Sequence, residues 1–157
     1  MRKLLLAAAA VAALASSGRS AHAEVGLGVF FGAPSGLDLK IDASPRSSID
    51  IVLGWSTFRD GRDHYGHITY LVTPFVGQGN SVVVPLRIGI GAAIYDDGSF
   101  DAGINAAVRV PLELALKLRS APVEFYGEIA LECTVIDANN NNDLFDAQGG
   151  IGFRAYF

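Results

Sequence analysis

Apolar and polar residues alternate along most of this chain with a period of two, which predicts β-strands. Leu37 and Leu39, for example, alternate with Asp38 and Lys40. No helical period competes with this pattern after residue 23. The alternation predicts eight strands, over Val25–Phe31, Gly36–Ala43, Ser47–Phe58, Tyr65–Val76, Ser81–Tyr95, Gly103–Leu118, Pro122–Ile136 and Gly149–Phe157.

The breaks between these segments carry glycine, proline, asparagine and aspartate, which are typical of turns and loops. All are short except the last, which runs from Asp137 to Asp146. No domain linker interrupts the series. Pro85 and Pro111 cannot donate a hydrogen bond to a neighbouring strand, so we expect β-bulges there. The pattern predicts one all-β domain, an eight-stranded antiparallel up-and-down β-barrel.

A barrel with one apolar face can have that face inside, in water, or outside, against lipid. The polar face holds small residues as well as charges, which suits the cramped interior of an eight-stranded barrel. Its charges also nearly balance, as enclosed charges must be paired. Those charges are Asp38, Asp42, Asp50, Glu113, Glu124, Glu128 and Glu132 against Lys40, Arg87, Arg109, Lys117, Arg119 and Arg154. These features favour a transmembrane barrel.

The lengths of the connections and the positions of the aromatic residues also favour a transmembrane barrel. They are explained best if both chain ends lie in the periplasm. If both chain ends are periplasmic, the even-numbered connections become short periplasmic turns and the longer ones face outward, as in membrane barrels. The aromatic residues then fall near two rims, as in interfacial girdles. The outer group is Phe30, Phe31, Trp55, Phe58, Tyr65, Tyr95 and Phe100, and the periplasmic group is Phe75, Phe125, Tyr126, Phe153, Tyr156 and Phe157.

The first 23 residues have the features of a secretory signal peptide. Arg2 and Lys3 precede the apolar run Leu4–Ala15, and Ala21-His22-Ala23 forms an A-x-A cleavage site. We therefore expect a signal peptide over 1–23 and a barrel domain over 24–157. Cleavage removes 3 of the 12 basic residues, and the remaining 9 against 16 acidic residues give a net charge of −7. This balance argues against nucleic-acid binding.

The whole mature segment resembles small eight-stranded outer-membrane barrels of the OmpA- and OmpX-like kind from Gram-negative bacteria. The resemblance rests on the cleavage site and on the alternating final strand with Ile151, Phe153, Ala155 and Phe157. It implies a location in the cell outer membrane and contact with outer-membrane lipid. It also implies that Phe157 and Phe153 form the signal that the barrel-assembly machinery reads.

The charges of the polar face are the candidate site. Eight strands leave an interior just wide enough for side chains, which favours a plugged ion-pair core over a pore. We expect a lumen salt-bridge network of Asp50, Arg87, Arg109, Glu113, Lys117, Glu128, Glu132 and Arg154.

Other candidate chemistry is weaker. His64 and His67 lie beside Asp60 and Asp63, but their spacing matches no zinc motif. Residues 137–143 present alternating oxygen ligands as calcium loops do, yet they lack the expected turn glycine and bidentate glutamate. We expect no catalytic residue, metal or cofactor, and we expect His64 and His67 to be solvated loop residues.

The leading hypothesis is a non-enzymatic outer-membrane barrel, which we expect to be a monomer. Its role would be envelope-structural or one of surface interaction, with the external loops contacting an unidentified ligand. A soluble exported barrel that binds a small apolar ligand inside is the first alternative. The second is a lipid-modifying outer-membrane enzyme that uses His64, His67 or the rim aspartates.

Overall fold

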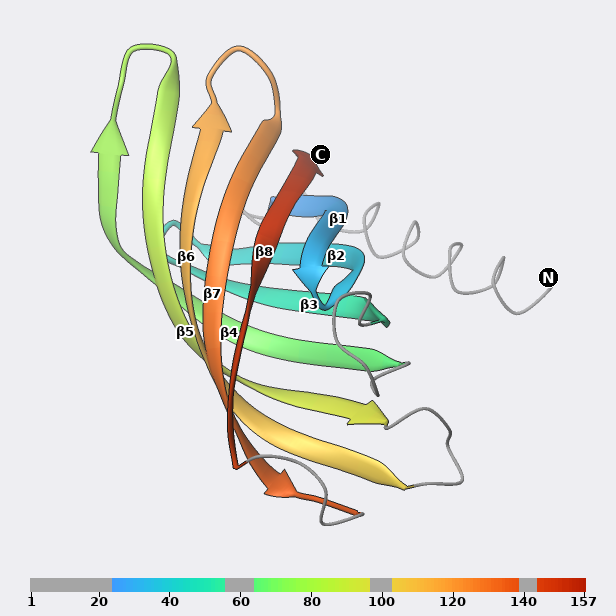
Figure 1. The fold of residues 1–157 in the computed structure, drawn as a ribbon. Coiled ribbons are helices and arrows are strands. Elements are labelled where there is room, and N and C mark those ends of the chain that lie inside the picture. Colours follow the sequence, from blue (N-terminus) through green and yellow to red (C-terminus); the bar gives the residue numbers. More distant parts are fainter. Residues whose placement is uncertain (1–23, 56–63, 97–102, 139–143) are drawn as a thin grey trace, which may run out of the picture.

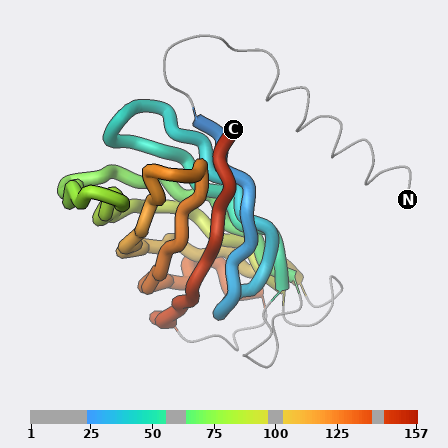
Figure 2. Tube along the Cα trace, turned by 90° about the horizontal axis from the view of Figure 1, so that it is seen from above, coloured from blue at the N-terminus to red at the C-terminus, as the bar shows by residue number. Residues whose placement is uncertain are grey.

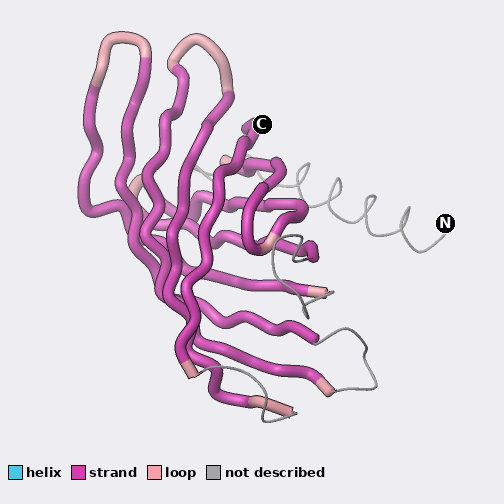
Figure 3. The backbone as a smooth tube through the Cα atoms, viewed as in Figure 1, coloured by secondary structure: helices cyan, strands magenta, loops and turns pink. Residues whose placement is uncertain are grey.

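A computed structural model describes residues 24–55, 64–96, 103–138 and 144–157. Strands make up nearly all of these residues, with short turns between them (Figure 3). The predicted signal peptide lies outside the described residues. The strands are β1 Val25–Ala33, β2 Ser35–Ser44, β3 Ser47–Trp55, β4 Tyr65–Gln78, β5 Val82–Asp96, β6 Ile104–Leu118, β7 Val123–Ile136 and β8 Phe145–Tyr156.

The eight strands form a closed barrel in which each strand pairs with its neighbour in the sequence. All of the pairings are antiparallel, and β8 closes the ring against β1 from Gly26↔Tyr156 to Ala33↔Gly149. Figure 2 shows β8 in red beside β1 in blue. The predicted all-β, eight-stranded, antiparallel up-and-down barrel is confirmed.

Strand boundaries differ from the prediction mainly at β8, which begins at Phe145 rather than Gly149. The aspartates and asparagines nearby indicated a loop. However, Phe145 pairs with Cys133 of β7, so the ladder continues through this polar stretch. The expected extension of the third strand over residues 56–58 lies outside the described residues.

Pro85 and Pro111 are not bulge sites, which corrects the prediction. Pro111 pairs with Ala130 in a β6–β7 register that is constant from Ala107↔Thr134 to Lys117↔Glu124. Between β5 and β6 the register is constant from Val83↔Lys117 to Gly91↔Arg109, with pairs missing beside each proline. The barrel therefore accommodates both prolines as gaps in one ladder, where the missing N–H groups leave bonds unmade.

A bulge does occur at Thr73 and Pro74 of β4, opposite the single residue Arg87 of β5. Beyond it, β4 and β5 continue past the end of β3, whose pairing with β4 stops at Ser47↔Val72. The β4–β5 and β6–β7 hairpins consequently project at one end of the barrel, near the C-terminus (Figure 1). We call this end, which carries the turns after β2, β4 and β6, the turn end.

Apolar side chains of the strands cover the outer surface, and charged side chains fill the interior. Leu53, Ile90, Leu131 and Ile151 are exposed, whereas Arg109 and Arg154 are among the most deeply buried residues. This arrangement is the reverse of that in a water-soluble protein. There, charged side chains are almost never fully buried unless they are paired, and large apolar patches are rarely exposed.

The described residues include no helix that is long and apolar enough to cross a membrane.

Candidate functional site

Arg154 of β8 is the centre of the interior charge network. Its guanidinium donates to Asp38 Oδ2 at 2.6 Å and Asp50 Oδ1 at 2.7 Å, on β2 and β3. It also donates to Glu113 Oε2 at 2.9 Å and Glu124 Oε1 at 3.1 Å, on β6 and β7. One side chain therefore links β8 to four other strands across the barrel.

Arg87 of β5 extends the network toward the turn end. It binds Glu124 through two bonds, Nη2 to Oε2 at 2.6 Å and Nη1 to Oε1 at 2.9 Å, and it also contacts Glu113. Glu113 and Glu124 thus each bridge Arg87 and Arg154. Bridged, charge-assisted bonds of this kind are among the strongest in proteins and fix side-chain geometry.

A second cluster surrounds Arg109 of β6. Arg109 Nη2 donates to Glu128 Oε1 at 2.6 Å, and Nη1 donates to Thr69 Oγ1 at 3.1 Å. Nη1 also lies 2.8 Å from His67 Nε2. The same His67 Nε2 lies 3.5 Å from Asp50 Oδ2, so His67 stands between the Arg109 cluster and the Arg154 network. Glu132 lies 3.7 Å from Arg109 Nε.

Four tyrosines complete these clusters from inside the barrel. Tyr65 donates to Glu132, and Tyr95 bonds Thr134 at 3.0 Å. Tyr126 donates to Asp38 and carries Arg154 3.6 Å above its ring centroid, a cation–π contact. Tyr156 donates to Glu124 at 3.0 Å.

The predicted aromatic girdles are therefore wrong for several members. Phe30 and these four tyrosines are buried inside the barrel, whereas the girdles require side chains on its outer surface near the two rims. The exposed aromatic residues of the prediction are Phe31, Trp55, Phe75, Phe125, Phe153 and Phe157. Each buried tyrosine lies on the same strand face as the charged residues, and that position in the alternation was the available signal. Phe58 and Phe100 lie outside the described residues.

Glycines on the inner face leave room for the large rings. A Cβ on Gly152 would lie 2.1 Å from the Tyr126 ring, and a Cβ on Gly26 would lie 3.0 Å from the Tyr156 ring. A second side chain does not fit at either place without movement. The small residues of the polar face thus leave room for the large side chains that extend from other strands.

The structure brings together seven of the eight residues of the predicted salt-bridge network. Lys117 is apart from them, at the turn end, where its ammonium binds the carboxylate of Glu24. Its position near the end of β6 places it beyond the filled section of the barrel. The prediction omitted Asp38, Lys40 and Glu124, which carry charges on the same strand faces.

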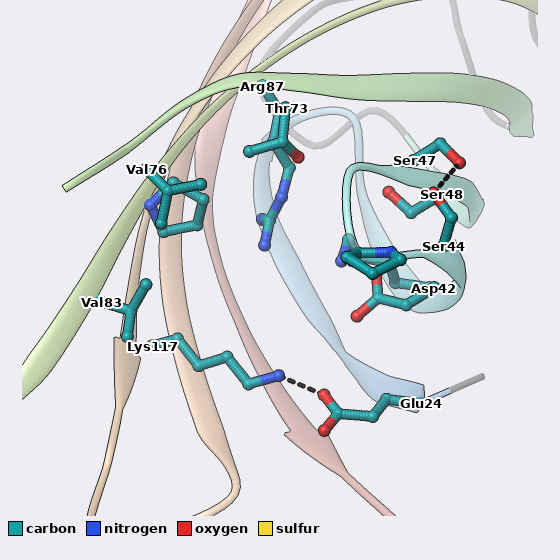
Figure 4. A pocket seen from close by; sticks show the side chains of 13 residues that line it. Glu24, Asp42, Ser44, Ser47, Ser48, Thr73, Val76, Val83, Arg87 and Lys117 are labelled. Carbon is teal, nitrogen blue, oxygen red and sulfur yellow. Dashed lines mark hydrogen bonds and ion pairs between the residues drawn. The ribbon is translucent and has the colours of Figure 1, made fainter. Parts of the chain in front are cut away.

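The turn end of the barrel opens into a cavity of about 260 Å³, which we call the mouth pocket. Figure 4 shows its walls, with Val76 and Val83 on one side and the serines of the β2–β3 turn on the other. Three cationic and two acidic side chains line it. The lining residues are Glu24, Lys40, Asp42, Ser44, Pro45, Ser47, Ser48, Thr73, Val76, Val83, Pro85, Arg87 and Lys117.

The two histidines have different environments, and only one fits the expectation of a solvated residue. His64 is exposed, and its Nδ1 lies 2.8 Å from Asp96 Oδ2. His67 is a buried strand residue bound to Arg109, which corrects its expected placement in a loop. Asp60, Asp63 and residues 139–143 of the calcium-like stretch lie outside the described residues. Within the described part, no three His, Cys, Asp or Glu side chains are grouped to hold a metal ion.

The two residues of the expected assembly signal point outward at the turn end. Phe153 of β8 packs against Phe125 of β7, with ring centroids 5.2 Å apart. Phe157 follows β8 and is exposed, and its N–H donates to Val25 O at 3.1 Å.

Comparison with known proteins gives no relative for this chain: no protein-family model, no curated protein and no solved structure matches it.

Proposed function

We propose that this protein is a non-enzymatic barrel of the bacterial outer membrane, with a plugged interior and an envelope-structural or surface-interaction role. The observation that carries the proposal is the inverted distribution of side chains. The outer surface is apolar and exposed, and the buried interior is charged. In water this arrangement leaves a large apolar surface exposed, whereas in a bilayer lipid covers that surface.

The interior also argues against the alternative of a soluble barrel with an apolar ligand inside. Such a barrel needs an apolar cavity, and this interior is filled with ion pairs around Arg154, Arg87 and Arg109. The filled interior supports a structural or surface role rather than passage of solutes.

We infer that the turn end faces the periplasm and that the connections after β3, β5 and β7 face outward. Single cysteines introduced in a Cys133→Ser background test this orientation. Gly61→Cys, in the connection between β3 and β4, is expected to react with a membrane-impermeant maleimide on intact Gram-negative cells. Ser120→Cys, in the β6–β7 turn, is the matched control and is expected to react only after the envelope is broken. The opposite pattern would contradict the orientation.

A deletion strain separates the two proposed roles. If the role is envelope-structural, the deletion strain is expected to be more sensitive to detergents. Expression of a variant that lacks residues 139–143 in this strain should then restore resistance. If the role is surface interaction, that shortened variant should fail to restore the surface phenotype although it reaches the membrane. A deletion strain with no envelope or surface phenotype would contradict the proposal.

A further inference from the structure

We propose that the mouth pocket is a binding site for a small organic carboxylate with an apolar body. Its volume of about 260 Å³ lies just below the range of typical ligand pockets, so the ligand must be small. This inference does not depend on the membrane location proposed above.

The first observation is an apolar wall that faces open space. Val76, Val83 and Pro85 lie on the inner face of the projecting β4–β5 hairpin and line the pocket. Val76 is 41% exposed. β5 pairs with this part of β4 on one side, but β3 stops opposite Val72, so β3 does not pair with it on the other side. A ligand's apolar body would cover these side chains and remove them from water.

The second observation is a cationic floor. Lys40 is buried, and its ammonium binds Asp42 and lies 3.2 Å from the hydroxyl of Tyr156. Arg87 also lines the pocket, and the ammonium of Lys117 lies 4.2 Å from the Tyr156 ring centroid. Asp42 neutralises Lys40, and Glu113 and Glu124 neutralise Arg87, so Lys117 is the cation here that favours an anionic ligand over a neutral one.

The third observation is that a carboxylate already occupies part of the pocket. Glu24 binds Lys117 there, and its own side chain is 55% exposed. Figure 4 shows this ion pair at the edge of the pocket, with Lys117 on the side of Val83 and Glu24 on the side of Asp42. Exposed pairs of this kind are weak. A ligand carboxylate can therefore replace Glu24 on Lys117, with its apolar body against Val83 and Pro85. Glu24 then acts as an internal competitor.

Calorimetric titration of the folded full-length mature chain with hexanoate tests this inference, because hexanoate is too short to form micelles at working concentrations. Hexanamide is the neutral control ligand. We expect hexanoate to bind and hexanamide to bind more weakly. Lys117→Gln should weaken hexanoate binding about fivefold, and Glu24→Gln should strengthen it about two- to fivefold, since each changes one exposed pair.

Two further variants complete the test. Val83→Ser should weaken binding without a change in charge. Arg119→Gln is the matched control, since Arg119 lies nearby in the β6–β7 turn and binds Gly79 O and Gln78 rather than lining the pocket. It should leave affinity unchanged. Absence of hexanoate binding, equal binding of hexanamide, or a Glu24→Gln variant with unchanged or lower affinity would each overturn the proposal.

Discussion

At the scale of single residues, the interior is held by a few arginines that each bind carboxylates from several strands. Arg154 has four such partners and is completely buried. Removing a buried cation leaves its carboxylates without compensation for the water they have lost. Lys117 forms a pair at the edge, where solvent screens the interaction. The two residues therefore allow a direct comparison of buried and exposed pairs.

Replacing Arg154 with methionine should lower the free energy of unfolding by about 3–5 kcal/mol, as for other broken buried pairs. Lys117→Met should cost about 1 kcal/mol or less, because its pair is partly exposed. Denaturant titration of both variants in the same detergent measures the difference. Equal effects of the two substitutions would contradict the assigned network.

Gly152→Ala should destabilise the barrel by about 1–3 kcal/mol, the usual cost of overpacking. The added methyl group would meet the Tyr126 ring at 2.1 Å. Gly127→Ala is the control, because its Cβ would have no neighbour nearer than 3.9 Å. Combining Gly152→Ala with Tyr126→Leu should cost less than the sum of the two single changes. Thermal unfolding of the four variants tests this, and strict additivity would argue against the contact.

At the scale of the strands, the alternation predicted which side chains share a face but not which face lies inside or which charges pair. Pairing depends on the register between strands, which the sequence pattern does not contain. Tyr126 was assigned to a rim from its position along the strand, although its face, shared with Glu124 and Glu128, indicated the interior. His67 was assigned to a loop because of the neighbouring aspartates. Pro111 shows that a closed ladder can tolerate a missing donor without a change of register.

Outward strand positions should respond to charge according to their depth in the membrane. Leu131 lies in the middle of β7 and is 66% exposed. Leu131→Arg should cost about 2–4 kcal/mol in a bilayer, whereas Leu118→Arg at the end of β6 should cost about 0–1 kcal/mol. Unfolding from lipid vesicles measures both. A negligible cost at Leu131, as expected for a water-exposed site, would count against membrane insertion.

At the scale of the whole molecule, the filled interior and the closed ring argue against a continuous water path. We expect the wild-type protein to show no steady conductance in planar lipid bilayers. Arg154→Ala removes the side chain that crosses the barrel. Among single substitutions in the interior, the folded form of this variant is the one in which we expect conductance. Steady conductance by the wild-type protein would contradict a plugged barrel.

Gel mobility is the most direct test of the proposal that this barrel resides in the outer membrane. The outer-membrane fraction of expressing cells is run in SDS with and without boiling. We expect the protein to be found in this fraction, to remain folded in cold SDS and to change its apparent mass on boiling. A protein recovered from the soluble periplasmic fraction with no change in mobility would contradict the proposed location.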